Sequence, residues 1–330
     1  FVAERRRSRV KQILHMARQL LVQQQMVRAI IALRPALIHA HDLNTLIPAL
    51  QAAGRAQVPL IYDAHEFNMD RVGIQNWLRP VFRRLEALAL KRAAGVIVPS
   101  PGIARALARF YRVPRPTVLE NWPLLDETLR PAIPDLRARL GIAENRPVAL
   151  YQGGLQPHRG QMLLIEAAAE VPELDLVLMG DGRLRTELAK KIVDLGLGGR
   201  VHLLAPEPLV TLLPLTMTAD FGVHPLEGGC LNHHQASPNK LYEYLHAELP
   251  VVVTDLPGMR RRLADAPGGD PSLRFAPGDK AGLIVALRRL ATDEVLRANL
   301  THSAREARRS YCWQAQEKTL KDLYRRVLPP

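Results

Sequence analysis

Residues 237–255 read Ser237-Pro238-Asn239-Lys240-Leu241-Tyr242-Glu243-Tyr244-Leu245 and, after four intervening residues, Pro250-Val251-Val252-Val253-Thr254-Asp255. Ser237 is a good N-cap, and Pro238 suits the first helical position because the N–H that proline lacks would have no partner there. The β-branched run that follows is typical of a strand buried on both faces. This stretch therefore predicts a helix that leads into a buried parallel strand.

The start of this helix also offers a site for an anion. Free N–H groups and the positive end of the helix dipole meet there, and Lys240 adds a full charge in the first turn. Glu243 lies one turn further in, where its carboxylate can accept two hydrogen bonds from a vicinal diol such as a ribose. The alternative is an ordinary capped amphipathic helix with Leu241, Tyr244 and Leu245 facing the core, and these residues alone leave both open.

On both sides of this stretch, short apolar runs alternate with helical patterns, which is typical of parallel sheets flanked by helices. We expect a proline-rich linker over 121–134 and two doubly wound, Rossmann-like domains at residues 1–125 and 126–310, with a C-terminal helix in 311–330 that crosses back to the first domain. The predicted strands are 36–40, 58–62, 95–99, 117–119, 148–151, 174–179, 201–204, 221–223 and 251–254.

Polar residues and glycines gather where these strands end, which is where ligands bind in such sheets. In the first domain these residues are His39, His41, Asp63, His65 and Glu66. In the second domain they are Gly153, Gly154, Gly180, Asp181, Gly182 and His224. We therefore expect a ligand-binding cleft that both domains face.

Composition narrows the class of protein. Two distant cysteines, Cys230 and Cys312, exclude a disulfide framework and suit a reducing compartment. No apolar run reaches transmembrane length. The adjacent His233 and His234 do not predict a metal site, because neighbouring histidines point apart and no spaced partner follows. We expect a cytoplasmic protein, with peripheral attachment to the inner face of the cytoplasmic membrane as the alternative.

The positive charge is concentrated in the first domain. Residues 1–125 hold 19 Lys and Arg against 7 Asp and Glu, whereas residues 126–330 are nearly balanced at 26 against 25. Aromatic residues make up only 5% of the chain and no nucleic-acid motif is present, so we do not expect a nucleic-acid partner. An anionic membrane surface fits the charge, and a solvated basic surface is the alternative. The basic residues include Arg5, Arg6, Arg7, Arg9, Lys11, Arg79, Arg83, Arg84, Lys91 and Arg92.

In order, the motifs resemble the nucleotide-sugar domain of retaining GT-B glycosyltransferases, and most closely the large fourth glycosyltransferase family (group 1). They are Gly153-Gly154-Leu155-Gln156-Pro157-His158-Arg159-Gly160, Met179-Gly180-Asp181-Gly182, Ala219-Asp220, and the stretch from Pro238 to Val252. In the first domain, His39-Ala40-His41-Asp42 and Tyr62-Asp63-Ala64-His65-Glu66 resemble the acceptor-side domain of the same family. That family begins with a strand and a glycine-rich loop, so we expect the first domain here to lack its N-terminal strands.

The resemblance implies roles for particular residues. Glu243 matches the ribose-binding second glutamate of the family's E-x7-E motif, and Gln235 holds the position of the first glutamate. The implied catalytic residues are His65, which matches the histidine that faces the donor sugar, and Arg159 and Lys240, which neutralise the diphosphate. His41, Asp42 and Glu66 are acceptor-side candidates. The implied donor-binding residues are Gly153, Gly154, Arg159, Gly180, Gly182, Leu204, Gln235, Ser237, Asn239, Lys240, Leu241 and Glu243.

The implied reaction moves a sugar, with retention, from a nucleotide diphosphate sugar to a polysaccharide or lipid-linked acceptor. We expect uridine as the base, no cofactor, and metal-independent transfer, since the chain contains no D-x-D sequence. An epimerase or phosphorylase of the same fold and a sugar-nucleotide-binding subunit without turnover are the alternatives. The sequence leaves the sugar, the acceptor and the oligomeric state open.

Overall fold

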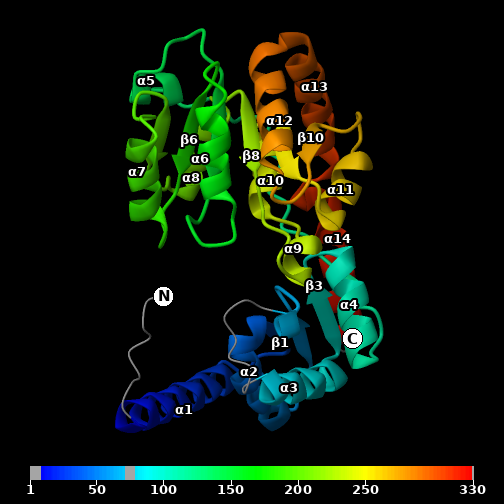
Figure 1. Ribbon diagram of the computed structural model, residues 1–330. Helices are drawn as coiled ribbons and strands as arrows, with labels where there is room; N and C mark the ends of the chain where they lie inside the picture. The colour runs from blue at the N-terminus through cyan, green and yellow to red at the C-terminus, as the bar shows by residue number, and fades with distance from the viewer. Residues whose placement is uncertain (1–8, 71–78, 329–330) are drawn as a thin grey trace. The chain divides into compact units, whose positions relative to one another are not determined.

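The protein forms two compact units. We describe them from a computed structural model over residues 9–70 and 79–328. The first unit comprises Phe1–Leu119 and Thr319–Pro330, and the second comprises Glu120–Lys318 (Figure 1). The arginines Arg5, Arg6 and Arg7 lie outside the described residues. The linker predicted over 121–134 has no helix or strand.

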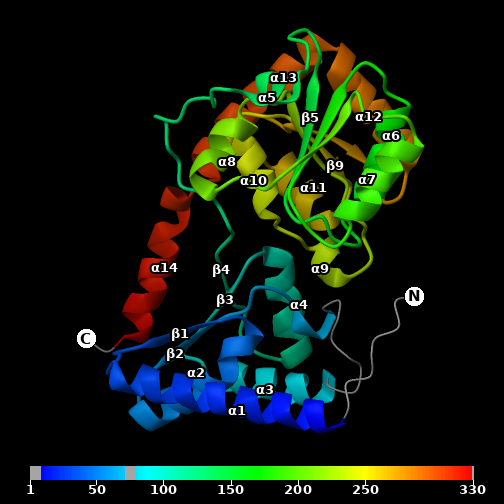
Figure 2. The same cartoon turned by 90° about the vertical axis from the view of Figure 1, so that its left-hand side faces the viewer.

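The first unit is built on a four-stranded parallel sheet with the order β1-β2-β3-β4. His41 at the end of β1 pairs in register with Asp63 at the end of β2. Helix α1 packs along α2, and α3 packs against α2 and β2 (Figure 2). The strands are β1 Ile38–His41, β2 Leu60–Asp63, β3 Gly95–Val98 and β4 Thr117–Val118, and the helices are α1 Arg9–Ala32, α2 Asp42–Ala56, the 3₁₀ helix η1 Asn68–Asp70, α3 Arg79–Arg92 and α4 Pro101–Tyr111.

The C-terminal helix α14, Trp313–Val327, contributes residues to both units. Its early residue Gln316 is buried in the second unit, where the side-chain amide accepts from the backbone N–H of Glu120. Further along, Leu323 packs on Ile61 and Ile97 in the core of the first unit. The last turns of α14 are therefore part of the first unit's core.

The second unit contains a six-stranded parallel sheet with the order β10-β9-β8-β5-β6-β7. Because β5 pairs with β6 on one side and β8 on the other, the strand order reverses between β5 and β8, and ligands of such sheets bind beside this point. The strands are β5 Val148–Gln152, β6 Asp175–Met179, β7 Val201–Leu204, β8 Phe221–His224, β9 Val251–Thr254 and β10 Ser272–Phe275. The helices are α5 Leu136–Leu140, α6 Gln161–Ala169, α7 Arg185–Asp194, α8 Leu209–Thr216, α9 Leu231–His234, α10 Asn239–His246, α11 Pro257–Ala264, α12 Lys280–Thr292 and α13 Glu294–Ser310.

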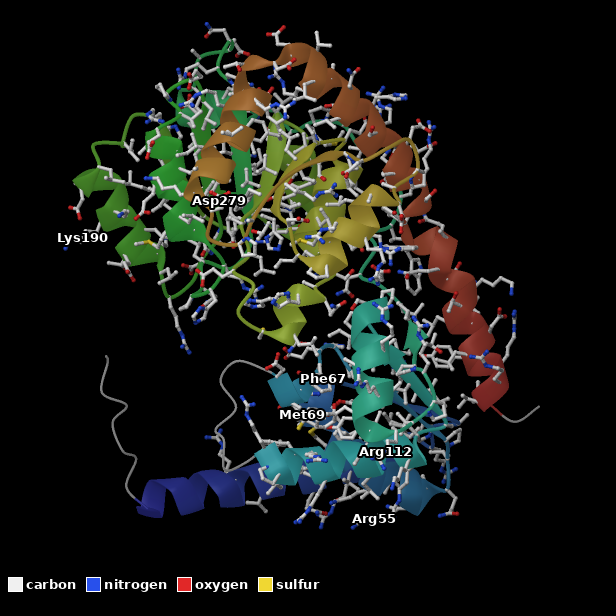
Figure 3. All side chains as sticks on the ribbon, turned by 45° about the vertical axis from the view of Figure 1, so that its right-hand side comes forward. Arg55, Phe67, Met69, Arg112, Lys190 and Asp279 are labelled. Carbon is white, nitrogen blue, oxygen red and sulfur yellow. The ribbon has the colours of Figure 1, made fainter. Side chains whose placement is uncertain are left out.

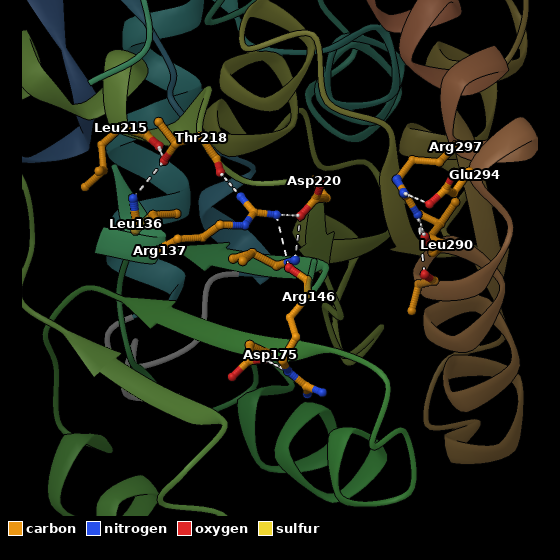
Figure 4. A network of polar contacts seen from close by, with 12 residues as sticks. Leu136, Arg137, Arg146, Asp175, Leu215, Thr218, Asp220, Leu290, Glu294 and Arg297 are labelled. Carbon is orange, nitrogen blue, oxygen red and sulfur yellow. Dashed lines mark hydrogen bonds and ion pairs between the residues drawn. The ribbon is translucent and has the colours of Figure 1, made fainter. Parts of the chain in front are cut away.

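A polar network fastens β5 and β8 at the edge of this sheet where these strands begin (Figure 4). The carboxylate of Asp220, just before β8, accepts 2.6 Å hydrogen bonds from the Arg137 guanidinium and from the backbone N–H of Val148, the first residue of β5. Arg146 pairs with Asp175 at the start of β6. The Ala219-Asp220 motif therefore aligns strands at the end opposite to the predicted binding residues.

Candidate functional site

A cavity of about 620 Å³ opens in the second unit at the carboxyl ends of β5, β6 and β8. This is the reversal point of the sheet, where the fold leaves a crevice between the loops of neighbouring strands. Seven of the twelve residues predicted to bind a donor line it, from the loops after β5 and β6 and from α10. The cavity is lined by Gln152, Gly153, Gly154, Gln156, Arg159, Met179, Gly180, Asp181, Pro206, Glu207, Leu212, His224, Pro238, Asn239, Lys240 and Glu243.

Two of the predicted glycines are needed at this edge, Gly180 because another backbone segment approaches it closely and Gly153 because of its positive φ. A Cβ atom on Gly180 would lie 2.0 Å from the carbonyl oxygen of Gly153, so no side chain fits there. Gly153 has a φ of +117° and its N–H donates to the carbonyl of Met179. The missing side chains let a ligand reach the backbone at the floor of the cavity.

The start of α10 differs from the sequence-based prediction. Helix α10 begins at Asn239, and Pro238 is its N-cap with no side-chain cap hydrogen bond, so the prediction of Ser237 as N-cap and Pro238 as first helical residue was wrong. The hydroxyl of Ser237 donates to the buried carboxylate of Glu120 at 2.7 Å and contacts the hydroxyl of Tyr242 at 2.9 Å. Because Glu120 also pairs with Arg262, it holds Ser237 in a network away from the cavity.

Glu243 is held in place by a strand residue. The side-chain amide of Gln152, the last residue of β5, donates to Glu243 Oε2 at 2.6 Å and accepts from Thr216 Oγ1 at 2.8 Å. Burial raises the pKa of the Glu243 carboxyl, while the hydrogen bond from Gln152 and the charge of Lys240 act in the opposite direction. The carboxylate is therefore oriented toward the cavity by a partner that sequence reasoning missed.

The ammonium group of Lys240, in the first turn of α10, has a strongly lowered pKa. Its Nζ lies 3.8 Å from the ring centroid of Tyr151, a cation–π contact. Burial and the nearby positive charge of Arg159 together lower the pKa of Lys240 to about 7, and the charge of Glu243 acts in the opposite direction. Two basic side chains thus line the same cavity near each other, and an anion bound beside them would stabilise the charged form of both.

His224, at the end of β8, is one of the strand-end residues at which the cleft was expected, but it was not among the donor-binding residues that the resemblance implied. It is fully buried and lines the cavity, and neither ring nitrogen has a hydrogen-bond partner among the described residues. Burial and the charges of Lys240 and Arg159 lower the pKa of His224 well below its ordinary value. A neutral imidazole offers one donor and one acceptor, which suits a hydroxyl group. Its signal in the sequence is a histidine that ends an apolar strand.

Several predicted donor-binding residues lie beside the cavity and not in its lining. Leu241 is buried in the core of the second unit, so its side chain cannot reach a ligand. Gln235 ends α9. Gly182 packs on the carbonyl of Leu155, and the carbonyl of Leu204 accepts from the N–H of Gly180 at 3.0 Å.

In the first unit, the predicted His65 and His41 surround one carboxylate. Asp63 Oδ2 lies 3.2 Å from His41 Nδ1 and 3.7 Å from His65 Nε2. The two histidine nitrogens are 3.4 Å apart, and both side chains are more than half exposed. Since β1 and β2 are parallel neighbours in register, their carboxyl ends bring these groups together.

The other two acceptor-side candidates flank this group. Asp42 has a φ of +64°, uncommon for a residue with a side chain, and its carboxylate accepts from the N–H of Leu43 at 2.6 Å. Glu66 follows His65 directly and is half-buried. All four candidates therefore lie at one edge of the first sheet.

Two family models match the chain. A glycosyl transferase 4-like domain matches residues 3–122, and glycosyl transferases group 1 matches residues 146–293. The lipopolysaccharide core biosynthesis glycosyltransferase LpsE of Rhizobium meliloti is 28% identical over 192 residues, which cover 58% of this chain and 52% of LpsE. A D-inositol 3-phosphate glycosyltransferase of Frankia alni is 27% identical over 89% of this chain and 74% of the relative. The chain thus spans about half the length of LpsE and three quarters of the Frankia protein.

Solved structures of low identity share the fold. Sucrose-phosphate synthase from Thermosynechococcus elongatus superimposes with a TM-score of 0.74 at 21% identity, covering 92% of this chain and 78% of the synthase. Anabaena HepE in complex with UDP and glucose gives 0.75 at 21% identity, covering 90% and 80%. With two parallel-sheet units and both family models in order, the chain belongs to the group 1 glycosyltransferases of GT-B fold.

Proposed function

We propose that this chain is a retaining glycosyltransferase that moves a sugar from a nucleotide diphosphate sugar to a polysaccharide or lipid-linked acceptor. One observation carries the proposal. A carboxylate, Glu243, and two cations, Lys240 and Arg159, line a single cavity together with the start of α10. This set matches the three parts of the donor: a ribose diol, a diphosphate and a sugar hydroxyl, the last of which His224 would bind.

In this function the protein stabilises a leaving group. When the bond between the sugar and the diphosphate breaks, negative charge grows on the diphosphate, and fixed cations and helix N–H groups are preorganised to receive it. Attack by the acceptor hydroxyl from the same face needs no carboxylate nucleophile. Lys240 and Arg159 supply the charge without a D-x-D sequence, and His65 remains the predicted catalytic histidine of the first unit.

We further propose UDP as the nucleotide, because HepE, a neighbour in fold, was solved with UDP and glucose. The acceptor class follows the names of the relatives, which include a lipopolysaccharide core glycosyltransferase and a phosphatidyl-myo-inositol mannosyltransferase. Both names point to acceptors built on lipids.

Replacing Glu243 by alanine should weaken binding of the nucleotide sugar by at least about 2 kcal/mol, roughly 30-fold, because two hydrogen bonds to a charged carboxylate are lost. Arg159→Ala should also weaken binding by removing a charge from the diphosphate site. Titration calorimetry with UDP-sugars measures both. Glu187→Gln, at an exposed position on α7, is the control and should bind as the wild type does.

Unchanged donor affinity in both cavity variants would overturn these roles. Activity assays with candidate acceptors then separate the reactions. Turnover that requires an acceptor supports transfer, turnover without one indicates an epimerase, and donor binding with neither transfer nor hydrolysis indicates a binding subunit.

The basic surface of the first unit supports a lipid-linked acceptor. One exposed stripe of α3 combines two apolar residues with three basic ones, an arrangement suited to the surface of an anionic bilayer. Val81 is 50% exposed and Leu88 is 40% exposed. The basic members are Arg84, Lys91 and Arg92. No helix in the described part of the chain combines the length and the apolar character needed to span a bilayer.

Reversing the charge of Arg84 and Lys91 together, both to glutamate, should weaken sedimentation with anionic vesicles at low salt by about 2 kcal/mol or more, roughly 30-fold. The control is the double reversal of Lys190, which projects from α7 in the second unit (Figure 3), and Arg289 on α12. The control has the same net charge. Equal losses in the two double variants would show that net charge acts and that the α3 stripe does not.

A further inference from the structure

The cluster at the edge of the first sheet contains more ligand groups than the proposed transfer reaction uses. Strand β1 ends in His39-Ala40-His41, and β2 ends at Asp63, with Ala64 and His65 following directly. Residues two apart on a strand lie on the same side, and His41 is in register with Asp63. His39, His41 and Asp63 therefore meet at the ends of two neighbouring strands, and the ring of His65 approaches them from the segment after β2.

The spacing of the ligand atoms fits a bound metal ion. Asp63 Oδ2 lies 3.9 Å from His39 Nε2, 3.2 Å from His41 Nδ1 and 3.7 Å from His65 Nε2. His41 Nδ1 and His65 Nε2 are 3.4 Å apart. Ligand atoms bound tetrahedrally at about 2.0–2.1 Å from Zn²⁺ lie about 3.3–3.4 Å from one another. These four separations are close to that value, and ligand atoms of His39, His41 and Asp63 all lie within 4.8 Å of one another. Small movements of the side chains, with His65 joining from the segment after β2, would complete the site.

The second ring nitrogen of His39 makes a contact that would orient the ring for metal binding. Its Nδ1 lies 2.7 Å from the hydroxyl of Tyr324, on α14, and its buried Nε2 faces Asp63 with no hydrogen-bond partner among the described residues. A metal-binding histidine typically donates its other N–H to an oxygen, which fixes the ring and the tautomer. Tyr324 supplies that oxygen.

We propose that His39, His41, Asp63 and His65 form a binding site for a divalent transition metal ion of the Zn²⁺ type. Nitrogen ligands outnumber oxygen ligands, which favours Zn²⁺, Co²⁺ or Ni²⁺ over Mg²⁺ or Ca²⁺. The half-exposed rings of His41 and His65 give the ion a path from solvent.

Binding has a consequence that rests on the proposed function. A metal ion would occupy the Nε2 lone pair of His65, the predicted catalytic histidine, so Zn²⁺ is an inhibitor of transfer in this scheme and not a cofactor. Zn²⁺ should then inhibit the wild type reversibly, whereas the activity that His41→Ala retains, at whatever level, should not change when Zn²⁺ is added.

The test is metal binding by the full chain, purified without a histidine tag and stripped with chelator. Titration with Co²⁺, followed by visible absorption, should show one equivalent with the intense bands of tetrahedral coordination, and calorimetry with Zn²⁺ should give the same stoichiometry. Mg²⁺ should not compete. His41→Ala should abolish the bands, and because its ring is exposed this variant should keep its circular dichroism.

Two further variants distinguish the metal ligands from residues outside the ligand set. Tyr324→Phe should keep the Co²⁺ bands and weaken affinity about 10-fold, as expected for a partner outside the ligand set. His302→Ala, on the exposed surface of α13, should bind as the wild type does. Absence of binding, or binding that survives His41→Ala unchanged, would overturn the metal site. The Co²⁺ absorption bands and the Zn²⁺ calorimetry do not depend on activity. The metal result therefore remains valid even if the transfer assay fails.

Discussion

Replacing Lys240 by methionine should lower the rate of sugar transfer about 10²–10³-fold, the usual cost of removing one fixed group that stabilises charge in the transition state. Methionine keeps the length of the side chain and its packing on Tyr151. Burial and the charge of Arg159 already disfavour the ammonium, since they lower its pKa to about 7. The melting temperature should therefore stay the same or rise, which separates the loss of rate from a loss of folding.

The same residue predicts how donor binding depends on pH. A diphosphate binds the charged form of Lys240, which predominates below its pKa of about 7. Affinity should be level below that pH and fall by up to about tenfold for each unit above it. A nucleotide sugar is the probe, because its diphosphate does not titrate in this range. Burial keeps the pKa of His224 well below its ordinary value, so this neighbour stays neutral throughout.

Lys240→Arg distinguishes this explanation from others. Arginine keeps its charge across the range, so donor affinity in this variant should no longer depend on pH. Lys190→Met, at an exposed lysine on α7, is the control for loss of one lysine and should match the wild type in rate and in pH profile. If Lys240→Arg keeps the slope of the wild type, another group titrates and the role of Lys240 in the pH profile is wrong.

The sheets were predictable because most strands are short apolar runs buried on both faces. Strand β10 was missed: its sequence, Ser272-Leu273-Arg274-Phe275, mixes polar and apolar residues because it lies at the edge of the sheet, beside β9 alone. The start of α10 was placed one residue early for a different reason. Ser237 has the residue type of an N-cap, but its hydroxyl is taken by Glu120, which lies 117 positions away in the chain. Local preference cannot include such a partner.

In the site, too, local spacing identified some residues, whereas contacts that depend on strand order could not be predicted. Glu243 and Lys240 were identified because helical spacing places both near the start of one helix. The contact between Gln152 and Glu243, and the approach of His224 to Lys240, depend on β5 and β8 being neighbours in the sheet. Strand order is a property of the whole sheet, so no local pattern contains it. The cluster around Asp63 likewise needs the register of β1 with β2.

Gly160→Ala should destabilise the protein by more than about 4 kcal/mol, a loss seen only for severe defects such as backbone clashes. Gly160 is the N-cap of α6, with a φ of +76°. A Cβ atom there would lie 1.8 Å from the carbonyl oxygen of Pro225 and 2.8 Å from its carbonyl carbon. Both neighbours are backbone atoms directly after β8, so they cannot turn aside as a side chain could.

Gly141→Ala isolates the contribution of backbone conformation. Gly141 has a φ of +69°, almost that of Gly160, but no atom lies within 4 Å of a Cβ placed there. Its replacement should therefore cost only the penalty of a left-handed residue, about 1–2 kcal/mol. Urea denaturation of the two variants and the wild type measures the difference, which should be at least about 2 kcal/mol. Equal losses of stability would mean that the positive φ accounts for both, and that the close approach of the Cβ atom to Pro225 costs no additional stability.

The position of Gly160 links this stability to the function. Gly160 follows Arg159, and Pro225 follows His224, so the contact between their backbones sets the distance between two residues that line the cavity. At a temperature where Gly160→Ala remains folded, its donor affinity should still fall, because Arg159 moves away from the loop that carries His224. Gly141→Ala should bind the donor normally at the same temperature. A folded Gly160→Ala variant with wild-type affinity would show that the loops adjust independently, and that Gly160 serves the fold alone.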